Sequence, residues 1–384
     1  MKPKSALTWI LIWAGLAVTY FIAGKFCIAM SALVAGVSWV LYIPAGLSLT
    51  ASLLWGRWVW PGVFLGELAA TLANGQPLGS GLIMASGNSL DAVLAGWWFH
   101  DRPGRRISFD QLGDVVQLLV GELLVLQPLS ACVGMLALSV EGSLPAGEVW
   151  STASAWFASN VFAQFVIAPP VLTWIRWRRP AQTAGEWREL LLLGALTVLL
   201  GAFGPGRWAL HGWPLPVTLF FAFPLLVWAS VRFVPSVAVT VGALLGLFAF
   251  DAVVAHAGPF QGTWTGAQMV YLNVFMGVCL GTALFLSAAL AQQRRFEAEQ
   301  AKLIEKLRAT ATQMRQLEDF VTFCAWSGRV RWKEEWVSVD TFLHERYNVS
   351  ITHGISEEAL ASLLKQLPQP PVGTGRGNPS HGTS

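Results

Sequence analysis

The stretch that decides the fold is AQMVYLNVFMGVCLGTALFLSAALAQQRRFEAEQAKLIEKLR, residues 267–308. Its first part, up to Ala291, is apolar and is long enough for one bilayer crossing, which takes about 20 residues of α-helix. Its second part is rich in charge, begins at Arg294 and Arg295, and follows the first with no Gly or Pro at the junction. The stretch therefore predicts a membrane-spanning helix that continues without a break into a soluble helix.

The charged residues divide the whole chain at the same point. Of 384 residues, 54% are hydrophobic and 12% are charged, whereas an ordinary soluble domain carries about 25% charge. Residues 1–295 contain 15 Lys and Arg and 11 Asp and Glu, and residues 296–367 contain 9 and 11. This composition excludes a soluble globular enzyme and a disordered chain. The mildly acidic tail also lacks the positive charge on which nucleic-acid binding depends.

Ten apolar segments precede the tail. By residue number they are 6–24, 36–56, 59–75, 81–99, 115–139, 150–174, 188–205, 214–231, 234–254 and 267–291. We therefore expect an all-α polytopic membrane protein, with about ten transmembrane helices in residues 1–292, followed by a cytoplasmic coiled-coil helix and a small soluble module.

The distribution of basic residues supports this count. With the N-terminus in the cytoplasm, the loops on the inner side contain 13 Lys and Arg, and those on the outer side contain only Lys25 and Arg207. Cytoplasmic loops of membrane proteins carry such an excess of positive charge. We expect a multi-pass protein of the bacterial inner membrane with both termini in the cytoplasm, its first segment a retained anchor.

Three of the expected spans carry glycines four residues apart, on one helical face. The pairs are Gly62 with Gly66, Gly242 with Gly246, and Gly277 with Gly281. A face of small residues allows two helices in a membrane to approach closely. The pairs therefore predict close helix packing, either within the chain or between two copies of it.

Polar side chains within the expected spans are the candidates for ligand sensing, because each is costly in hydrocarbon and needs a partner. They are Glu67, Asn88, Asp91, Glu122, Asn160 and Gln164. Asn88 shares a helical face with Asp91, and Asn160 shares one with Gln164. These groups either line a polar pocket that recognises a small ligand or relays a proton, or they join helices through hydrogen bonds.

Several short motifs follow one another in an order typical of a known family. They are YIPAG at 42–46, GR at 56–57, WPGVFLG at 60–66, GNSLDA at 87–92, VIAP at 166–169, PLLVWASVRF at 224–233 and GPF at 258–260. Over about residues 10–295 the chain resembles the bacterial membrane-associated sensor domain of the first MASE type. The resemblance assigns a topological or packing role to Pro44, Gly46, Arg57, Pro61, Gly62, Gly66, Pro169, Arg232, Gly258 and Pro259.

The resemblance implies a sensory input domain of the kind that is attached to histidine kinase or diguanylate cyclase output domains. It names no stimulus. The chain departs from the family at Ser159-Asn160, where the usual pair is Gly-Asp, so an ionisable group is absent there. Val234 also replaces a glycine.

Residues 293–321 have the pattern of a signalling coiled coil. Apolar side chains recur there at heptad spacing: Phe296, Leu303, Leu307, Met314 and Leu317. We expect a short parallel coiled coil that makes the protein a homodimer. The alternative is a single amphipathic helix that lies on the tail or on the membrane surface.

Residues 322–367 resemble a small regulator module with a C-A-W-C…S-H-G-I-C pattern, whose cysteines have metal-ligand spacing. Here Cys324 remains, but Ser327 and Ser356 replace other cysteines, and a zinc site needs four Cys or His ligands. We expect a metal-free unit packed around Trp326, Trp336, Phe342 and Leu343. Residues 368–384 are rich in Pro, Gly and Ser and are expected to be disordered.

The sequence contains no usable phosphate-binding loop, nucleophile elbow or zinc-protease motif, and the tail is too short for a kinase or cyclase domain. We expect no enzymatic activity and no cofactor. The favoured function is a membrane sensor that binds a stimulus among its helices and passes the signal through the tail helix to a separate kinase or cyclase. The alternatives are a small-solute transporter and a scaffold that recruits a signalling enzyme.

The native cysteines test the predicted topology. In intact cells, Cys27 should react with a membrane-impermeant maleimide, because it lies at the outer end of the first span, and Cys324 should react only after the cells are opened. Labelling is measured by mass spectrometry of the purified chain. Modification of Cys324 from outside would refute a cytoplasmic tail.

Overall fold

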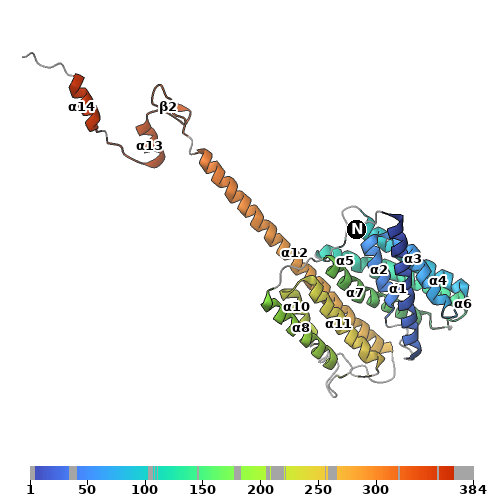
Figure 1. The fold of residues 1–384 in the computed structure, drawn as a ribbon. Coiled ribbons are helices and arrows are strands. Elements are labelled where there is room, and N and C mark those ends of the chain that lie inside the picture. The colour runs from blue at the N-terminus through green and yellow to red at the C-terminus, as the bar shows by residue number, and fades with distance from the viewer. Residues whose placement is uncertain are drawn as a thin grey trace, which may run out of the picture. The chain divides into compact units, whose positions relative to one another are not determined.

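The computed structural model describes residues 5–33, 41–102, 107, 109, 111–144, 147–176, 183–204, 208, 220, 222–255, 257, 266–318, 321–352 and 354–366. The chain divides into two compact units, Met1–Glu299 and Gln300–Ser384. The first unit is a helical bundle, and the second is small (Figure 1).

The bundle contains a helix in each of the ten predicted apolar segments. The helices are α1 (Ala6–Leu33), α2 (Ile43–Trp55), α3 (Trp60–Leu72), α4 (Leu78–Gly96), α5 (Leu112–Gly121), α6 (Gln127–Glu141), α7 (Val149–Arg176), α8 (Ala184–Phe203), α10 (Ala222–Arg232), α11 (Pro235–Val254) and α12 (Gly266–Glu318). Short 3₁₀ and π turns occupy η1 (Arg57–Val59), η2 (Trp97–Asp101) and η3 (Glu122–Leu126).

Among the described helices, five segments are both long and apolar enough to cross a membrane. They are Ala6–Met30, Leu112–Glu141, Val149–Ile175, Pro235–Val254 and Val274–Met314. The shorter apolar helices include α2 and α10. Length and composition thus identify a membrane protein.

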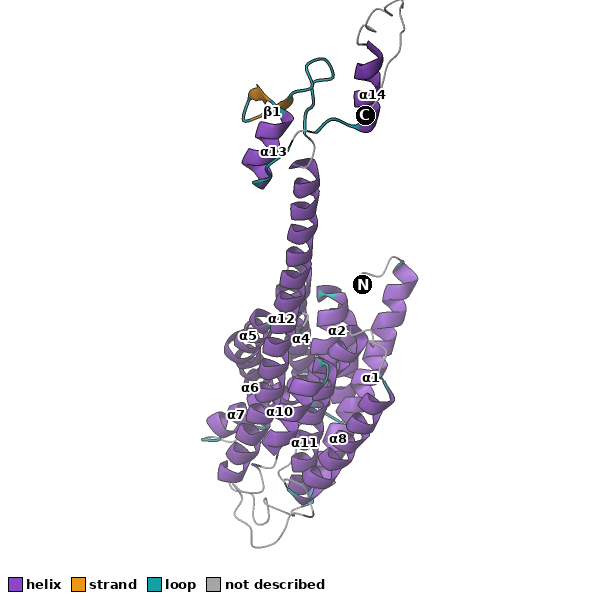
Figure 2. Cartoon of the chain, turned by 90° about the vertical axis from the view of Figure 1, so that its left-hand side faces the viewer, coloured by secondary structure: helices purple, strands orange, loops and turns teal. Residues whose placement is uncertain are grey.

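The order of packing places α7 in the middle of the bundle. Helix α1 packs on α3, α3 on α4, and α4 on α6, while α7 contacts α2, α6 and α11. One large apolar core includes Leu49 of α2, Phe162 of α7, Leu245 of α11 and Leu280 of α12. Figure 2 shows the bundle of helices to which α7 belongs. Helix α7 therefore shares this core with α2, α11 and α12.

Two of the three glycine pairs serve packing within the chain. A Cβ atom added to Gly62 would lie 2.9 Å from the backbone oxygen of Trp13, and one on Gly66 would lie 2.7 Å from Cβ of Tyr20, both on α1. Gly242 and Gly246 of α11 likewise approach α12. By contrast, an added Cβ on Gly277 or Gly281 would meet no atom of the described residues within 4 Å.

The expected span 115–139 is one helix with a π-helical turn at its centre. Pro128 lies just after η3, and proline has no N–H and clashes with the carbonyl four residues earlier. A π turn, with hydrogen bonds between residues five apart, relieves that clash. The backbone N–H of Gln127 donates to the carbonyl of Glu122, as this pattern requires. The π turn η3 therefore changes which side chains of α5 and α6 lie on the same face of the helix.

Helix α12 is unbroken from Gly266 to Glu318, as its sequence predicts. In its charged part the apolar heptad residues are more than half exposed in the single chain. They are Phe296 at 56%, Leu303 at 58%, Leu307 at 62% and Met314 at 61%. Leu317 lies within the same helix. This pattern leaves an apolar stripe along an otherwise polar helix.

The tail module contains a β-hairpin, which its sequence pattern did not predict. Strands β1 (Val330–Trp332) and β2 (Glu335–Val337) pair antiparallel, with Trp332 opposite Glu335. Both residues of the connecting turn, Lys333 and Glu334, have positive φ, as a type I′ hairpin turn requires. The turn escapes prediction because neither is the Asn or Gly that favours this conformation.

The packing of this module also differs from the prediction. Trp326 is 98% exposed and is therefore not part of the core of the module. The edge of the Trp332 ring packs against Phe342, which is buried on α13 (Val339–Tyr347) together with Val330 of β1. Helix α14 (Glu357–Gln366) follows. Residues 368–384 lie outside the described residues.

The glycine geometry predicts opposite outcomes for two alanine substitutions. Gly66→Ala should destabilise the bundle by about 1–3 kcal/mol, because its methyl group pushes against the backbone oxygen of Ala17 and the side chain of Tyr20. Gly281→Ala should change stability by less than about 1 kcal/mol, because its methyl group meets open space. Thermal unfolding in detergent, followed by tryptophan fluorescence, compares the two. Equal destabilisation of both variants would contradict this packing.

Candidate functional site

A polar cavity of about 260 Å³ lies at the end of the bundle where α1, α3 and α6 finish and where α2, α4 and α7 begin. Its polar lining comes from six side chains, and apolar groups complete it. The lining residues are Cys27, Ile28, Tyr42, Glu67, Thr71, Gln76, Met84, Leu138, Trp156, Ser159 and Asn160. Two of the predicted sensing residues, Glu67 and Asn160, therefore share one cavity.

Glu67 is the acidic group of this cavity. Its side chain is 3% exposed, and the hydroxyl of Tyr42 donates to its Oε2 atom at 2.6 Å. The side chains of Tyr20 and Asn88 also hydrogen-bond to it. All three partners are neutral, so Glu67 supplies the acidic group of the cavity lining.

Asn160 joins two helices at the opposite wall. Its Nδ2 atom donates to the hydroxyl of Ser130 on α6 at 3.1 Å, and Nε1 of Trp156 approaches the same hydroxyl at 3.4 Å. A carboxylate at this position has no hydrogen to donate. The amide of Asn160 therefore ties α7 to α6 through a hydrogen bond that a carboxylate could not donate.

A second polar cluster is buried deeper in the bundle and unites the other predicted residues. Glu122 and Gln164 are fully buried, and Asp91 is 8% exposed. The Nε2 atom of Gln127 donates to Oε2 of Glu122 at 3.1 Å. Asp91 lies close enough to interact with Glu122 and Gln127, and Gln164 lies beside Glu122. Four helical segments meet at this cluster, which we call the acidic cluster.

Helix α4 connects the cavity with the acidic cluster. Asn88 reaches Glu67 of the cavity, and Asp91, three residues further along α4, reaches the acidic cluster. The shared face of Asn88 and Asp91 was predicted from their spacing. The structure thus brings all six predicted polar residues into two neighbouring groups.

Gln127 was not among the predicted site residues. In a regular α-helix, residues five apart point about 140° away from each other, so Gln127 and Glu122 could not share a face. The π turn η3 brings them together. Pro128 within an apolar span was the signal that the helical register changes there.

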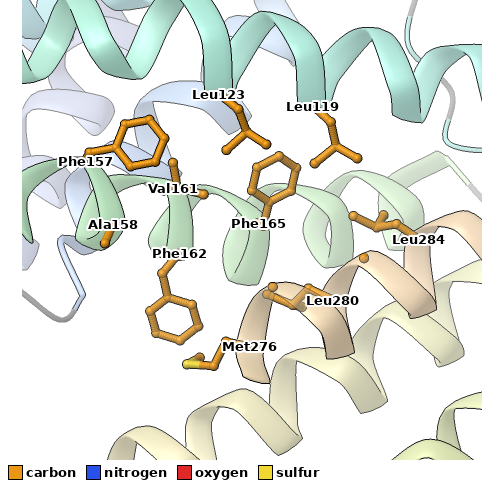
Figure 3. Close-up of a pocket in the computed structure, with 12 residues that line it drawn as sticks. Leu119, Leu123, Phe157, Ala158, Val161, Phe162, Phe165, Met276, Leu280 and Leu284 are labelled. Carbon is orange, nitrogen blue, oxygen red and sulfur yellow. The ribbon is translucent and has the colours of Figure 1, made fainter. Parts of the chain in front are cut away.

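A second cavity, of about 270 Å³, is apolar (Figure 3). Leu119 and Leu123 line it from above, Phe157, Phe162 and Phe165 come from α7, and Met276, Leu280 and Leu284 come from α12. The open glycines Gly277 and Gly281 also line it. Helix α7 therefore faces the polar groups on one side and this second cavity, beside α12, on another. We call the second cavity the apolar groove.

The predicted topology residues have structural partners. Nε of Arg57 lies 3.7 Å from Oδ2 of Asp101, and Arg232 makes a two-pronged contact with Glu189, at 2.5 and 3.2 Å. Pro44 and Pro61 lie in the first turns of α2 and α3, where proline is tolerated. Gly46 lets α2 approach Ile167 of α7, and Pro169 lies inside α7. Gly258 and Pro259 fall outside the described residues.

Cys324 is a free, half-buried cysteine of the tail module. The hydroxyl and backbone N–H of Ser327 hydrogen-bond to the Cys324 thiol and hold its pKa below the ordinary value. Among the residues that the structure describes, no group of three or more His, Cys, Asp or Glu side chains is suited to a metal ion. His353 lies outside them.

Comparison with known families matches residues 13–294 to the MASE1 family. Comparisons with curated proteins and with solved structures give no match. The matched range contains the polar cavity, the acidic cluster and the membrane part of α12.

The hydrogen bond between Tyr42 and Glu67 predicts the effect of one conservative change. Tyr42→Phe removes the hydroxyl alone and leaves a buried carboxyl oxygen without that donor, which should cost about 1–3 kcal/mol of stability. Unfolding of the purified protein in detergent measures the loss. Tyr347→Phe, at an exposed position in the tail, is the matched control and should have no effect. Equal stability of Tyr42→Phe and the wild type would contradict the hydrogen bond between Tyr42 and Glu67.

Proposed function

Because the chain belongs to the MASE1 family of membrane-associated sensor domains, we propose that it is a sensor whose polar cavity binds the stimulus. The observation that carries the proposal is the buried Glu67 carboxyl in a cavity shared by six segments. Helices that share a binding site can shift relative to one another when a ligand favours one arrangement. The cavity suits a small polar molecule that donates hydrogen bonds to Glu67.

The route from cavity to tail passes through α7 and α12. Asn160 of α7 lines the polar cavity, and Phe162 and Phe165 of the same helix line the apolar groove against α12. A packed core resists displacement, whereas a groove leaves α12 room to move. Since α12 is continuous to Glu318, a shift or rotation of its membrane part would reach the tail.

The exposed apolar stripe on α12 supports a parallel coiled coil between two copies of the chain. Leu303, Leu307 and Met314 are at heptad positions and lie open in the single chain. Membrane anchoring keeps the two helices at a high effective concentration, which offsets the shortness of the pair. A histidine kinase or diguanylate cyclase on the cytoplasmic side of the inner membrane is the output partner we propose. We assign the chain itself no enzymatic activity.

A transporter is the second candidate. Pro169 and Pro170 lie inside α7 and a π turn lies between α5 and α6, and irregular helices beside buried polar groups are typical of alternating access. Transport activity in reconstituted vesicles that survives deletion of residues 293–384 would favour this function. A scaffold would instead retain its partner when Glu67 and Asn160 are changed.

Crosslinking at the coiled-coil seam tests the sensor proposal. In a background with Cys324→Ser, Leu307→Cys should form a disulfide-linked dimer in membranes, because this position lies in the seam. Glu305→Cys, on the outer face of the same helix, is the control and should crosslink at least about tenfold more slowly. Crosslinking is measured by non-reducing gel electrophoresis.

The same measurement tests the coupling between cavity and tail. Glu67→Gln, which changes the cavity, should alter the rate of crosslinking at Leu307→Cys, whereas Glu148→Gln, at the exposed start of α7, should not. A monomer alone, or a rate that Glu67→Gln leaves unchanged, would argue against a signal that passes through α12.

A further inference from the structure

We propose that the acidic cluster of Asp91, Glu122, Gln127 and Gln164 binds a small hard cation, with Na⁺ as the ion that fits best. This site is separate from the polar cavity, and the proposal stands whether or not the cavity binds a stimulus. It rests on unsatisfied oxygen atoms, on the charge of the cluster and on the helix geometry that assembles it.

The oxygen atoms are the first observation. Four side-chain oxygens of the cluster are buried and have no hydrogen-bond partner: Oδ1 of Asp91, Oε1 of Glu122, Oε1 of Gln127 and Oε1 of Gln164. An unpartnered polar atom inside a membrane costs several kcal/mol, so such atoms are rarely left together without a ligand. A bound cation satisfies several oxygens at once.

The charge of the cluster is the second observation. Asp91 and Glu122 are close enough to interact electrostatically, and two carboxylates that share a site cannot both carry their charge without a counter-ion. Among the residues that the structure describes, no Lys or Arg forms an ion pair with either carboxyl. Two basic residues of the bundle have other contacts: Arg57 with Asp101, and Lys25 with Asn74. A monovalent cation with one proton on the pair leaves the cluster neutral.

The ligand atoms determine which cation fits. All candidate ligands are carboxylate or amide oxygens, which suit hard cations rather than zinc or copper. Mg²⁺ needs near-ideal octahedral geometry and gives up its water reluctantly, and Ca²⁺ takes 6–8 oxygens. Four unpartnered oxygens, from Asp91, Glu122, Gln127 and Gln164, suit a sodium ion better than either.

The π turn is the third observation, because it builds the cluster. It sets Gln127 beside Glu122 on one face and orients that face toward α4 and α7. Single π turns occur frequently at functional sites. In membrane proteins, irregular helical turns at the level of buried acidic groups are a common way to form ion sites.

Thermal unfolding of the full chain in lipid nanodiscs tests the proposal. NaCl is titrated against N-methyl-D-glucamine chloride at constant ionic strength, with KCl and CaCl₂ in parallel, and unfolding is followed by tryptophan fluorescence. The wild type should show a saturable rise in melting temperature with Na⁺ and a weaker rise with K⁺ or Ca²⁺.

Variants assign the response to the cluster. Glu122→Gln should lose the Na⁺-dependent rise and be at least as stable without Na⁺ as the wild type, because it removes a buried charge. Gln164→Leu keeps both carboxyls and should need at least about tenfold more Na⁺ for the same rise. Glu148→Gln, an exposed carboxyl outside the cluster, is the matched control and should respond as the wild type does.

Two outcomes would overturn the proposal. The first is an identical melting temperature for the wild type in all salts, which would mean that protons alone neutralise the cluster. The second is a Na⁺ response that Glu122→Gln and Gln164→Leu retain. Neither outcome affects crosslinking at Leu307, so the cation site and the sensor function are tested separately.

Discussion

The absence of water from the bilayer interior is the constraint on which this structure depends. There, each buried polar group needs a partner from the protein itself or from a ligand. Tyr42 satisfies one oxygen of Glu67, and Ser130 accepts from Asn160. Each of these hydrogen bonds joins two helical segments, so the groups that make a polar site also fix the arrangement of the bundle. The same side chains therefore line the polar cavity and hold the helices together.

Proline and glycine adapt the helices to that constraint in two different ways. Pro128 disrupts the regular α-helical hydrogen bonds, and a π turn forms there. This turn places Gln127 on the same face as Glu122. Glycines remove side chains, and at Gly62 and Gly66 the space is filled by α1. At Gly277 and Gly281 the space remains open beside α7. Helix α12 thus has open space beside it on the side that faces α7.

Much of the fold was predictable because it depends on local composition. Apolar length predicts a helix in each of the ten segments, and an uninterrupted run of helix-forming residues predicts the continuity of α12. The spacing of Asn88 and Asp91 predicts their common face. What the sequence could not supply was register and pairing. Gln127 was missed because helical spacing was assumed to be constant, and the β-hairpin because Lys333-Glu334 is an unusual turn pair. Trp326 was placed in a core only because of its size, yet it is exposed.

The boundary between the two compact units falls inside a continuous helix, between Glu299 and Gln300. In such a joint, the number of residues sets the phase: each added or removed residue turns everything downstream by about 100° and moves it by about 1.5 Å along the axis. Insertions or deletions in this helix therefore preserve the angular phase only at certain lengths. Seven residues is the shortest length that also keeps the heptad pattern. In the proposed sensor, the length of α12 therefore matters as much as the residues on its surface.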